Sequence, residues 1–195
     1  MVKGGVNVEQ CVVKYNKFYN AYDILLSLQE NFNDIRIFFD TGASKTIITL
    51  KEFLQPYEYR KHKDEIIKQL ENSSYLRVEP RSASGNKITG YLCHLNNVQL
   101  GDEVVDSFYF FLVPDERLQD SLLGNDFLHY CDYVHDANRD IVIKSFDLES
   151  YEEYFEKLTS HNLKHRSLDL RSLLENLEIK VETKSDLASL KAFKD

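Results

Sequence analysis

The stretch IRIFFDTGASKTIITL, residues 35–50, places one carboxylate, that of Asp40, between two apolar runs. Apolar residues on both sides predict a buried strand that enters the segment and a second strand that leaves it. Because carboxylates are seldom buried without a partner, Asp40 needs a chemical reason to lie between two such strands. An ordinary turn is the simpler alternative, since Asp, Gly and Ser are common turn residues.

The composition restricts the class of protein. The chain has 195 residues, of which 43% are hydrophobic, and it contains twelve Tyr and twelve Phe. These values predict a globular domain with a full core and an appendage, not a disordered chain. The net charge of −8 argues against a nucleic-acid partner. No apolar run approaches the roughly 20 residues of a membrane span, so we expect no membrane partner.

The cysteines and histidines indicate the compartment and the absence of a metal. Cys11, Cys93 and Cys131 are an odd number with no C-x-x-C pair, which predicts reduced thiols. Residues 1–10 contain no signal-peptide core, so we expect a cytoplasmic protein. The pairs Cys93-His94 and His129-x-Cys131 fit no common zinc spacing, and we predict no metal and no cofactor.

Hydrophobic patterning along the chain predicts a β-rich body. Runs with strand character lie at 8–15, 22–30, 34–40 and across 75–114. The runs at 22–30 and 34–40 read as a hairpin joined by an Asn-rich turn. Ile66, Ile67 and Leu70 have helical spacing within a charged segment and predict a helix near 61–72. Turns are expected at 84–86 and 101–102.

From about residue 147 the pattern becomes helical. Four apolar residues follow a helical stripe, namely Tyr151, Tyr154, Phe155 and Leu158. Segments 167–177 and 184–193 also predict helices, with Ser167 and Ser185 as N-caps. An exposed stripe of this size is a liability, so we expect it to pack on the β body or on a partner subunit.

Three segments occur in the order of a known family. DTGAS (40–44) resembles the active-site signature of aspartic proteases, and SASGNKITGYL (82–92) is similar to a retropepsin flap. SLLGNDFL (121–128) resembles the second signature, an apolar pair followed by Gly that packs behind the catalytic loop. A closing hairpin, DYVHDANRDIVI, follows. Together they resemble the single-lobed, retropepsin-like aspartic proteases, which include the protease-like domain of DNA-damage-inducible proteins.

The resemblance implies a fold and a division of the chain. It implies a mostly β protein, a closed antiparallel retropepsin-like barrel with a flap hairpin. The helical pattern after residue 146 adds a C-terminal helical extension that lies outside the family pattern. The protease domain is expected at 8–146 and the extension at 147–195. The family pattern has a shorter interval between Asp40 and Gly85, and the predicted helix near 61–72 accounts for the added length.

The resemblance also implies an activity that needs two copies of the chain. Peptide hydrolysis without a metal requires a base to activate water and an acid to protonate the substrate. Two carboxylates that share one proton perform both tasks. D-T-G occurs once in the sequence, so the second carboxylate is expected from a homodimer partner across a two-fold axis.

The roles of the signature residues follow from the same resemblance. Asp40 is expected to be the catalytic carboxylate, with Thr41 bonding to the partner's loop and Gly42 giving the backbone room. Ala43 and Ser44 are expected to contact the peptide substrate. The flap tip, expected to close over that substrate, comprises Ser84, Gly85 and Asn86.

Alternatives remain open beside this interpretation. The fold could serve as a non-catalytic dimerisation module, or as a mobile-element protease that processes its own polyprotein. Asp136-x-Asn138-x-Asp140 resembles the start of a calcium loop but lacks its Gly and distal Glu, so we predict a charged hairpin turn. Asp126 is predicted to be a structural helix cap, and to be the first substitute if the second acid lies within one chain.

Overall fold

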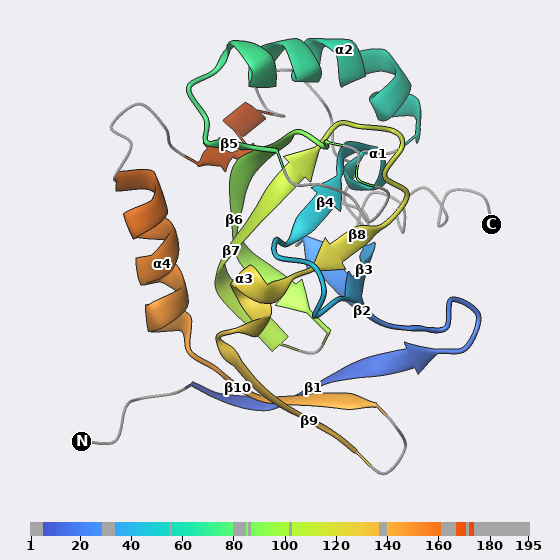
Figure 1. The fold of residues 1–195 in the computed structure, drawn as a ribbon, viewed down its shortest axis with the longest axis vertical. Helices are drawn as coiled ribbons and strands as arrows, with labels where there is room; N and C mark the ends of the chain where they lie inside the picture. The colour runs from blue at the N-terminus through green and yellow to red at the C-terminus, as the bar shows by residue number, and fades with distance from the viewer. Residues whose placement is uncertain are drawn as a thin grey trace, which may run out of the picture.

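The elements of the fold are seen in a computed structural model (Figure 1), which describes residues 6–28, 34–54, 56–79, 85, 87–101, 103–136, 140–160, 167–170 and 172–173. The strands are β1 (Val6–Asn16), β2 (Ala21–Leu28), β3 (Ile35–Phe39), β4 (Ile47–Thr49), β5 (Arg77–Val78), β6 (Gly90–Leu100), β7 (Glu103–Val113), β8 (Ser121–Leu123), β9 (Cys131–His135), β10 (Ile141–Phe146) and β11 (Leu168–Asp169). The helices are α1 (Leu50–Phe53), α2 (Pro56–Asn72), α3 (Asn125–Leu128) and α4 (Leu148–Ser160).

Six strands close into a barrel. The strand order is β11-β6-β7-β4-β8-β3-β2-β1-β10-β9, and the additional pairing of β2 with β6 closes the ring of β6, β7, β4, β8, β3 and β2. The expected closed, mostly β barrel is confirmed. It is mixed, because β3–β8 and β4–β7 run parallel while the other pairs in the ring are antiparallel.

The parallel pairing of β3 with β8 brings the two signature segments together. Phe39 lies opposite Leu123 in the register, so Asp40 and Gly124 follow their strands at the same edge of the barrel. The expected hairpin between the second and third strands is also present, with Asp23 opposite Phe38. Strand pairing therefore sets the position of the Asp40 loop.

Helix α2 covers one end of the barrel, at the top of Figure 1. Its apolar residues Ile66 and Leu70 are buried, as the helical spacing predicts. The helix begins earlier than expected, at Pro56, because proline is tolerated in the first turn, where its missing N–H has no helical partner. Among the described residues, no helix is long and apolar enough to cross a membrane.

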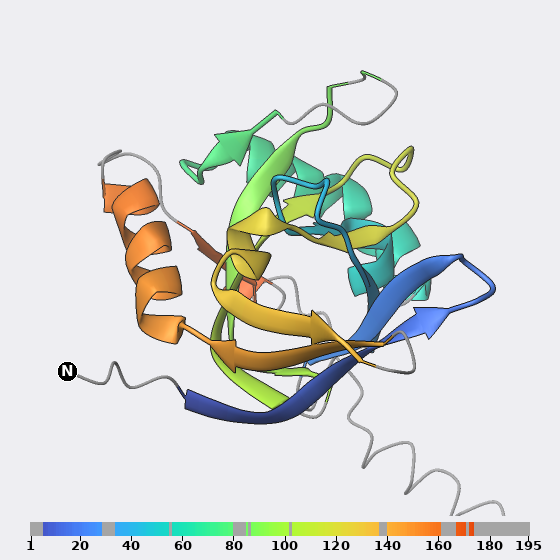
Figure 2. The ribbon, with the colours of Figure 1, turned by 60° about the horizontal axis from the view of Figure 1, so that its bottom comes forward.

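Helix α4 lies beside the β body (Figure 2). Its predicted apolar stripe packs against the hydrophobic core, as expected. Tyr151 and Phe155 are fully buried, and the Phe155 ring stacks on that of Tyr109 in β7 with centroids 4.5 Å apart. The Tyr151 hydroxyl accepts from the Tyr109 N–H at 2.8 Å and donates to the Tyr109 carbonyl at 3.2 Å. This hydroxyl therefore satisfies backbone groups that an adjacent strand would otherwise satisfy.

The chain after α4 differs from its predicted helix. Residues 168 and 169 form β11, which pairs in parallel with Cys93 and His94 of β6, and helical residues follow only from 170. The helix predicted to begin after Ser167 is thus wrong at its start, because the edge of β6 offers backbone partners that override local propensity. The segment 184–193 and its cap Ser185 lie outside the described residues. The division at residue 146 stays a prediction.

Candidate active site

Asp40 lies where β3 ends and its loop begins. Its N–H donates to the Leu123 carbonyl at 3.1 Å, which extends the β3–β8 ladder by one residue. The side chain of Asp40 is only partly buried, unlike Ile37, which is fully buried. Strand pairing therefore fixes the backbone of Asp40 while its carboxylate remains accessible to solvent.

The signature residues form a tight turn around this carboxylate. The backbone N–H groups of Gly42 and Ala43 donate to Asp40 Oδ1 at 2.8 and 3.3 Å. A Cβ at Gly42 would lie 3.1 Å from the same oxygen, so a larger residue would press on the carboxylate. Thr41, Gly42 and Ser44 are exposed and Ala43 is half-buried. The orientation of the carboxylate is thus set by its own loop.

The second signature packs directly behind the first, as the resemblance predicts. Asn125 donates its N–H to the Ala43 carbonyl at 2.9 Å. Its side-chain amide donates to the Thr41 carbonyl at 2.7 Å. One residue of the α3 segment therefore holds two carbonyl groups of the Asp40 loop.

Asp126 holds the far end of the same loop. Its Oδ1 accepts from the Thr46 N–H at 2.6 Å and from the Thr46 hydroxyl at 2.7 Å. Burial raises the pKa of Asp126, against the opposing effects of the Thr46 hydrogen bond and the Lys45 charge. Asp126 therefore has the predicted structural role, but it does not cap helix α3. The N-cap position of α3 is Gly124, and no side chain caps the helix.

Gly124 allows the two signatures to approach. A Cβ there would overlap the carbonyl carbon and oxygen of Lys45 and would lie 2.9 Å from the Lys45 nitrogen. The Gly124 N–H donates to Thr46 Oγ1 at 3.1 Å. Its φ is −99°, which any residue can adopt, so the requirement for glycine is one of space and not of conformation.

Sequence reasoning missed a link between the loop and α4. Lys45 Nζ donates to the Tyr154 hydroxyl at 3.0 Å and lies 5.6 Å from the centres of the Phe111 and Tyr154 rings. Residues 45 and 154 lie 109 positions apart, and no local pattern joins them. The sequence signal that could have indicated this link was Lys45 itself, a lysine that directly follows the D-T-G-A-S motif.

The expected flap is described only in part. Its base pairs Arg77 with Tyr91 and Val78 with Gly90. Gly85 is exposed with φ +80°, a left-handed conformation that favours glycine, and has open space around it. Ser84 and Asn86 lie outside the described residues.

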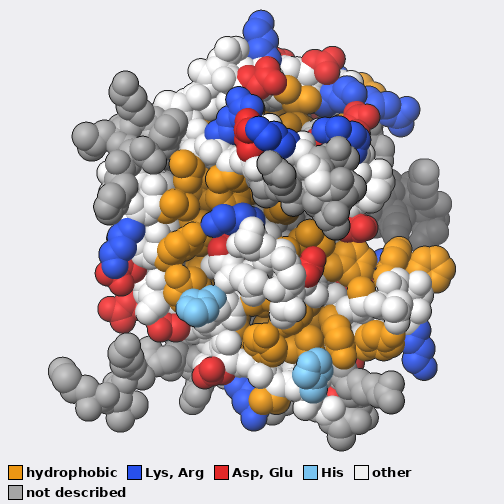
Figure 3. All heavy atoms as spheres, in the orientation of Figure 1, with side chains coloured by type: hydrophobic (Ala, Val, Ile, Leu, Met, Phe, Trp, Pro, Cys, Tyr) orange, Lys and Arg blue, Asp and Glu red, His pale blue; other side chains and the backbone are white. Residues whose placement is uncertain are grey.

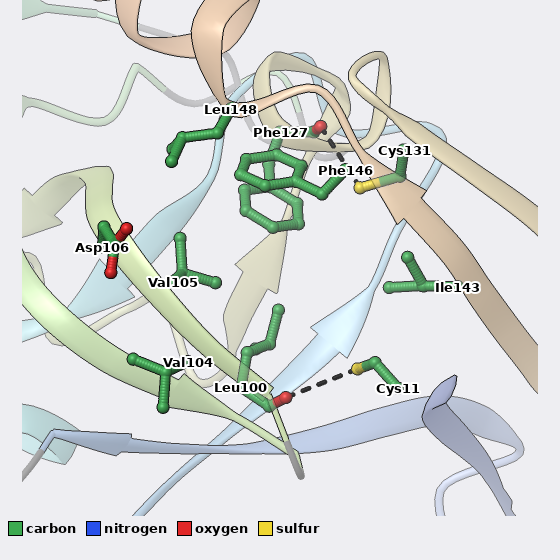
Figure 4. Close-up of a pocket in the computed structure, with 10 residues that line it drawn as sticks. All are labelled: Cys11, Leu100, Val104, Val105, Asp106, Phe127, Cys131, Ile143, Phe146 and Leu148. Atoms are coloured by element: carbon green, nitrogen blue, oxygen red, sulfur yellow. Dashed lines mark hydrogen bonds between the residues drawn. The ribbon is translucent and has the colours of Figure 1, made fainter. Parts of the chain in front are cut away.

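A partly open apolar pocket lies apart from the Asp40 loop, between β1, β7, β10 and α3 (Figure 4). Its volume is about 70 Å³, and the thiols of Cys11 and Cys131 lie at its wall. These thiols donate to the carbonyl oxygens of Leu100 and Phe127 at 3.4 and 3.7 Å. Burial raises the pKa of the Cys131 thiol, so it remains protonated and unreactive at neutral pH.

The remaining candidate sites have structural explanations. Asp140 accepts from Lys14 Nζ at 2.9 Å and from the Tyr15 N–H at 3.1 Å, and its own N–H donates to Asp136 at 2.9 Å. These contacts make a charged hairpin end, although Asn138 lies outside the described residues. Within the described ranges, no group of three or more His, Cys, Asp or Glu residues is placed to hold a metal ion.

A retropepsin-like aspartic protease from Rickettsia conorii is similar in structure, with 19% sequence identity and a TM-score of 0.44 over 75% of this chain and 99% of that chain. No curated protein matches the sequence. Residues 27–130, which are 104 of the 195 residues, match the family described as gag-polyprotein putative aspartyl protease. Because this match spans more than half of the sequence, the chain belongs to that family of retropepsin-like aspartic proteases.

Proposed function

We propose that the protein is a homodimeric aspartic endopeptidase, in which the Asp40 carboxylates of two copies activate one water molecule. The observation that carries this proposal is the Asp40 loop itself. In each chain, the Asp40 carboxylate is accessible and is held by the N–H groups of Gly42 and Ala43 at the barrel edge. A rigid, accessible carboxylate is what general acid–base chemistry requires.

In the proposed reaction the two Asp40 residues have complementary tasks. The ionised carboxylate takes a proton from water as the oxygen attacks the peptide carbonyl carbon. The protonated carboxyl donates to the carbonyl oxygen, and a proton then passes to the leaving amine as the C–N bond breaks. A pair of neighbouring carboxyl groups holds one proton readily, because two like charges at short range disfavour double ionisation.

Asp126 is a poor substitute for the second acid. It is buried, and its Oδ1 already accepts both hydrogen bonds from Thr46. Moving this carboxyl toward Asp40 would leave the buried Thr46 donors without a partner, at a cost of about 1–3 kcal/mol for each group. The second carboxylate is therefore assigned to a second copy of the chain.

Two features support a dimer contact near Asp40. Thr41 and Gly42 are exposed at the loop tip. Within the described part of the chain, β9 pairs with β10 alone, which leaves its other edge open. The Tyr133 ring of β9 contacts the ring of Phe39, the residue before Asp40, with ring centroids 5.1 Å apart. Figure 3 shows hydrophobic side chains gathered on this face, over the region where β1, β3 and β9 lie in Figure 1.

Val134→Asp is expected to weaken dimerisation. Val134 is 41% exposed on β9, and a two-fold contact along this edge would bring two added carboxylates together. We expect the dimer dissociation constant to rise about tenfold, measured by sedimentation across a concentration series.

Thr41→Ala is expected to weaken the dimer and turnover together.

The matched control is Tyr57→Asp, which adds the same charge at a 68% exposed apolar residue of α2, at the opposite end of the molecule from β9. This variant should assemble like the wild type. A Val134→Asp protein that dimerises normally would show that β9 does not form the contact.

The function itself is tested with a peptide library and purified protein between acid and neutral pH, with and without pepstatin. We expect cleavage that pepstatin blocks and a bell-shaped rate profile with a mildly acidic optimum, because one carboxyl group must be ionised and the other protonated. A rate that continues to rise into alkaline pH would indicate a Cys or Ser nucleophile. No cleavage at any pH would favour the dimerisation module.

The substrate class is a separate question. The family description names a gag polyprotein, which supports the second candidate, a protease that processes the polyprotein of a mobile element. A processing enzyme would cut few library peptides, each with an extended preferred sequence. A broad cleavage pattern would instead favour a general endopeptidase.

A further inference from the structure

Helix α4 lies beyond the part of the chain that matches the family, yet it touches the loop that carries Asp40. The contact is made by Lys45, whose ammonium group donates to the Tyr154 hydroxyl at 3.0 Å. The same ammonium group lies 5.6 Å from the centres of the Phe111 and Tyr154 rings, within the range of a cation–π interaction. Lys45 is thus held at the helix by a hydrogen bond and the face of the Tyr154 ring, and at β7 by the face of the Phe111 ring.

The helix is anchored to the barrel independently of Lys45. Tyr151 bonds through its hydroxyl to both backbone groups of Tyr109, and Phe155 stacks on the Tyr109 ring. Two residues further along β7, the Phe111 N–H donates to the Thr46 carbonyl at 2.9 Å. One edge of β7 therefore supports α4 and the Asp40 loop side by side, so Tyr154 has a fixed base from which to hold Lys45.

The backbone of Lys45 has little freedom to absorb a change. Gly124 lies against it so closely that no side chain fits between them. The next residue, Thr46, is held by Asp126 through two hydrogen bonds. On the other side, the Ala43 carbonyl is held by Asn125. A displacement at Lys45 would therefore be passed along the loop toward Asp40.

We infer that α4 is a positioning element of the active site, and that Lys45 and Tyr154 are positioning residues which hold the Asp40 loop in its working geometry. This inference rests on the proposed protease function. It assigns a task to the C-terminal helix, whose contact with Lys45 through Tyr154 would be required for full turnover but not for folding of the barrel or for substrate binding. Small misplacements of reacting groups reduce rates strongly, which is why such a contact can act without touching the substrate.

The test compares Tyr154→Phe and Lys45→Met in the full-length protein. The first removes the hydroxyl and keeps the ring, and the second removes the charge and keeps an apolar stem. We expect each to lower kcat by about threefold to tenfold, the equivalent of one hydrogen bond. KM and the pH optimum should be unchanged, because neither residue contacts the peptide or the proton that is shared. The double variant should lose no more than the worse single variant, since both remove one interaction.

Lys157→Met is the matched control, because Lys157 is a second lysine at α4 that pairs with Glu153 on the surface of the helix. It should have the kcat of the wild type. Melting temperature and sedimentation are recorded for all variants, and each should fold and dimerise normally. Unchanged kcat in folded Tyr154→Phe and Lys45→Met proteins would overturn the inference, and so would a loss that appears only as weaker dimerisation or raised KM.

A failure of the inference about α4 can be distinguished from a failure of the proposed function. If wild-type protein cleaves peptides and both variants match it, only the role of α4 is wrong. If wild-type protein cleaves nothing, or if its cleavage survives the loss of the Asp40 carboxylate, the protease assignment itself is wrong, and the role of α4 is overturned with it.

Discussion

Asp40→Asn is expected to reduce peptide cleavage by about a thousandfold or more while the protein remains folded. An amide cannot take a proton from water or share one with a second carboxylate. The two hydrogen bonds to Oδ1 from Gly42 and Ala43 can be kept by the amide oxygen, so the loop should hold its shape. Thermal melting and the initial rate of cleavage are measured on the same preparation.

Asp64→Asn is the control, because Asp64 is exposed on α2 and its substitution makes the same chemical change away from the Asp40 loop. It should retain the activity of the wild type. Full activity in folded Asp40→Asn would falsify the assignment of Asp40 and would direct the search to Asp126.

Mixed dimers extend this test to the two-copy mechanism. When equal amounts of wild-type and Asp40→Asn chains exchange freely, about one quarter of the dimers carry two carboxylates. Activity should then fall to about one quarter of that of the same total amount of wild-type protein, and not to one half. Activity in proportion to the wild-type share would mean that each chain works alone.

Gly124→Ala is expected to be among the most destabilising single substitutions in the chain. The added methyl group would overlap the carbonyl group of Lys45, which is backbone and cannot rotate away as a side chain can. We expect a loss of about 3 kcal/mol or more in the free energy of unfolding, measured by urea denaturation. The surviving folded fraction should also be less active, because the substitution separates the two signature segments that position Asp40.

Gly85→Ala provides the comparison. An added Cβ at Gly85 meets nothing within 4 Å, so only its left-handed φ of +80° opposes the substitution. A loss of about 1 kcal/mol is expected there. Equal stability of Gly124→Ala and the wild type would mean that the two signatures do not pack as closely as the structure has them.

The sequence alone determined the features that depend on neighbouring residues. The D-T-G-A-S turn after an apolar strand, the amphipathic helix around Ile66 and Leu70, and the Tyr151–Phe155 stripe all follow local periodicity or turn chemistry. The order of DTGAS, SASGNKITGYL and SLLGNDFL along the chain was sufficient to indicate the retropepsin-like family. These predictions succeed because the hydrophobic pattern and the backbone preference point to the same structure.

Tertiary structure alone decided the contacts between distant segments. The parallel pairing of β3 with β8, the hydrogen bond from Thr46 to Asp126 and the hydrogen bond from Lys45 to Tyr154 join residues far apart in the chain. β11 shows the same effect, because Leu168 and Asp169 follow the edge of β6 instead of forming the helix that their own pattern favours. Local propensity is worth a fraction of a kcal/mol per residue, whereas burial and completed hydrogen bonds are worth more, so the partner that the fold supplies determines the outcome.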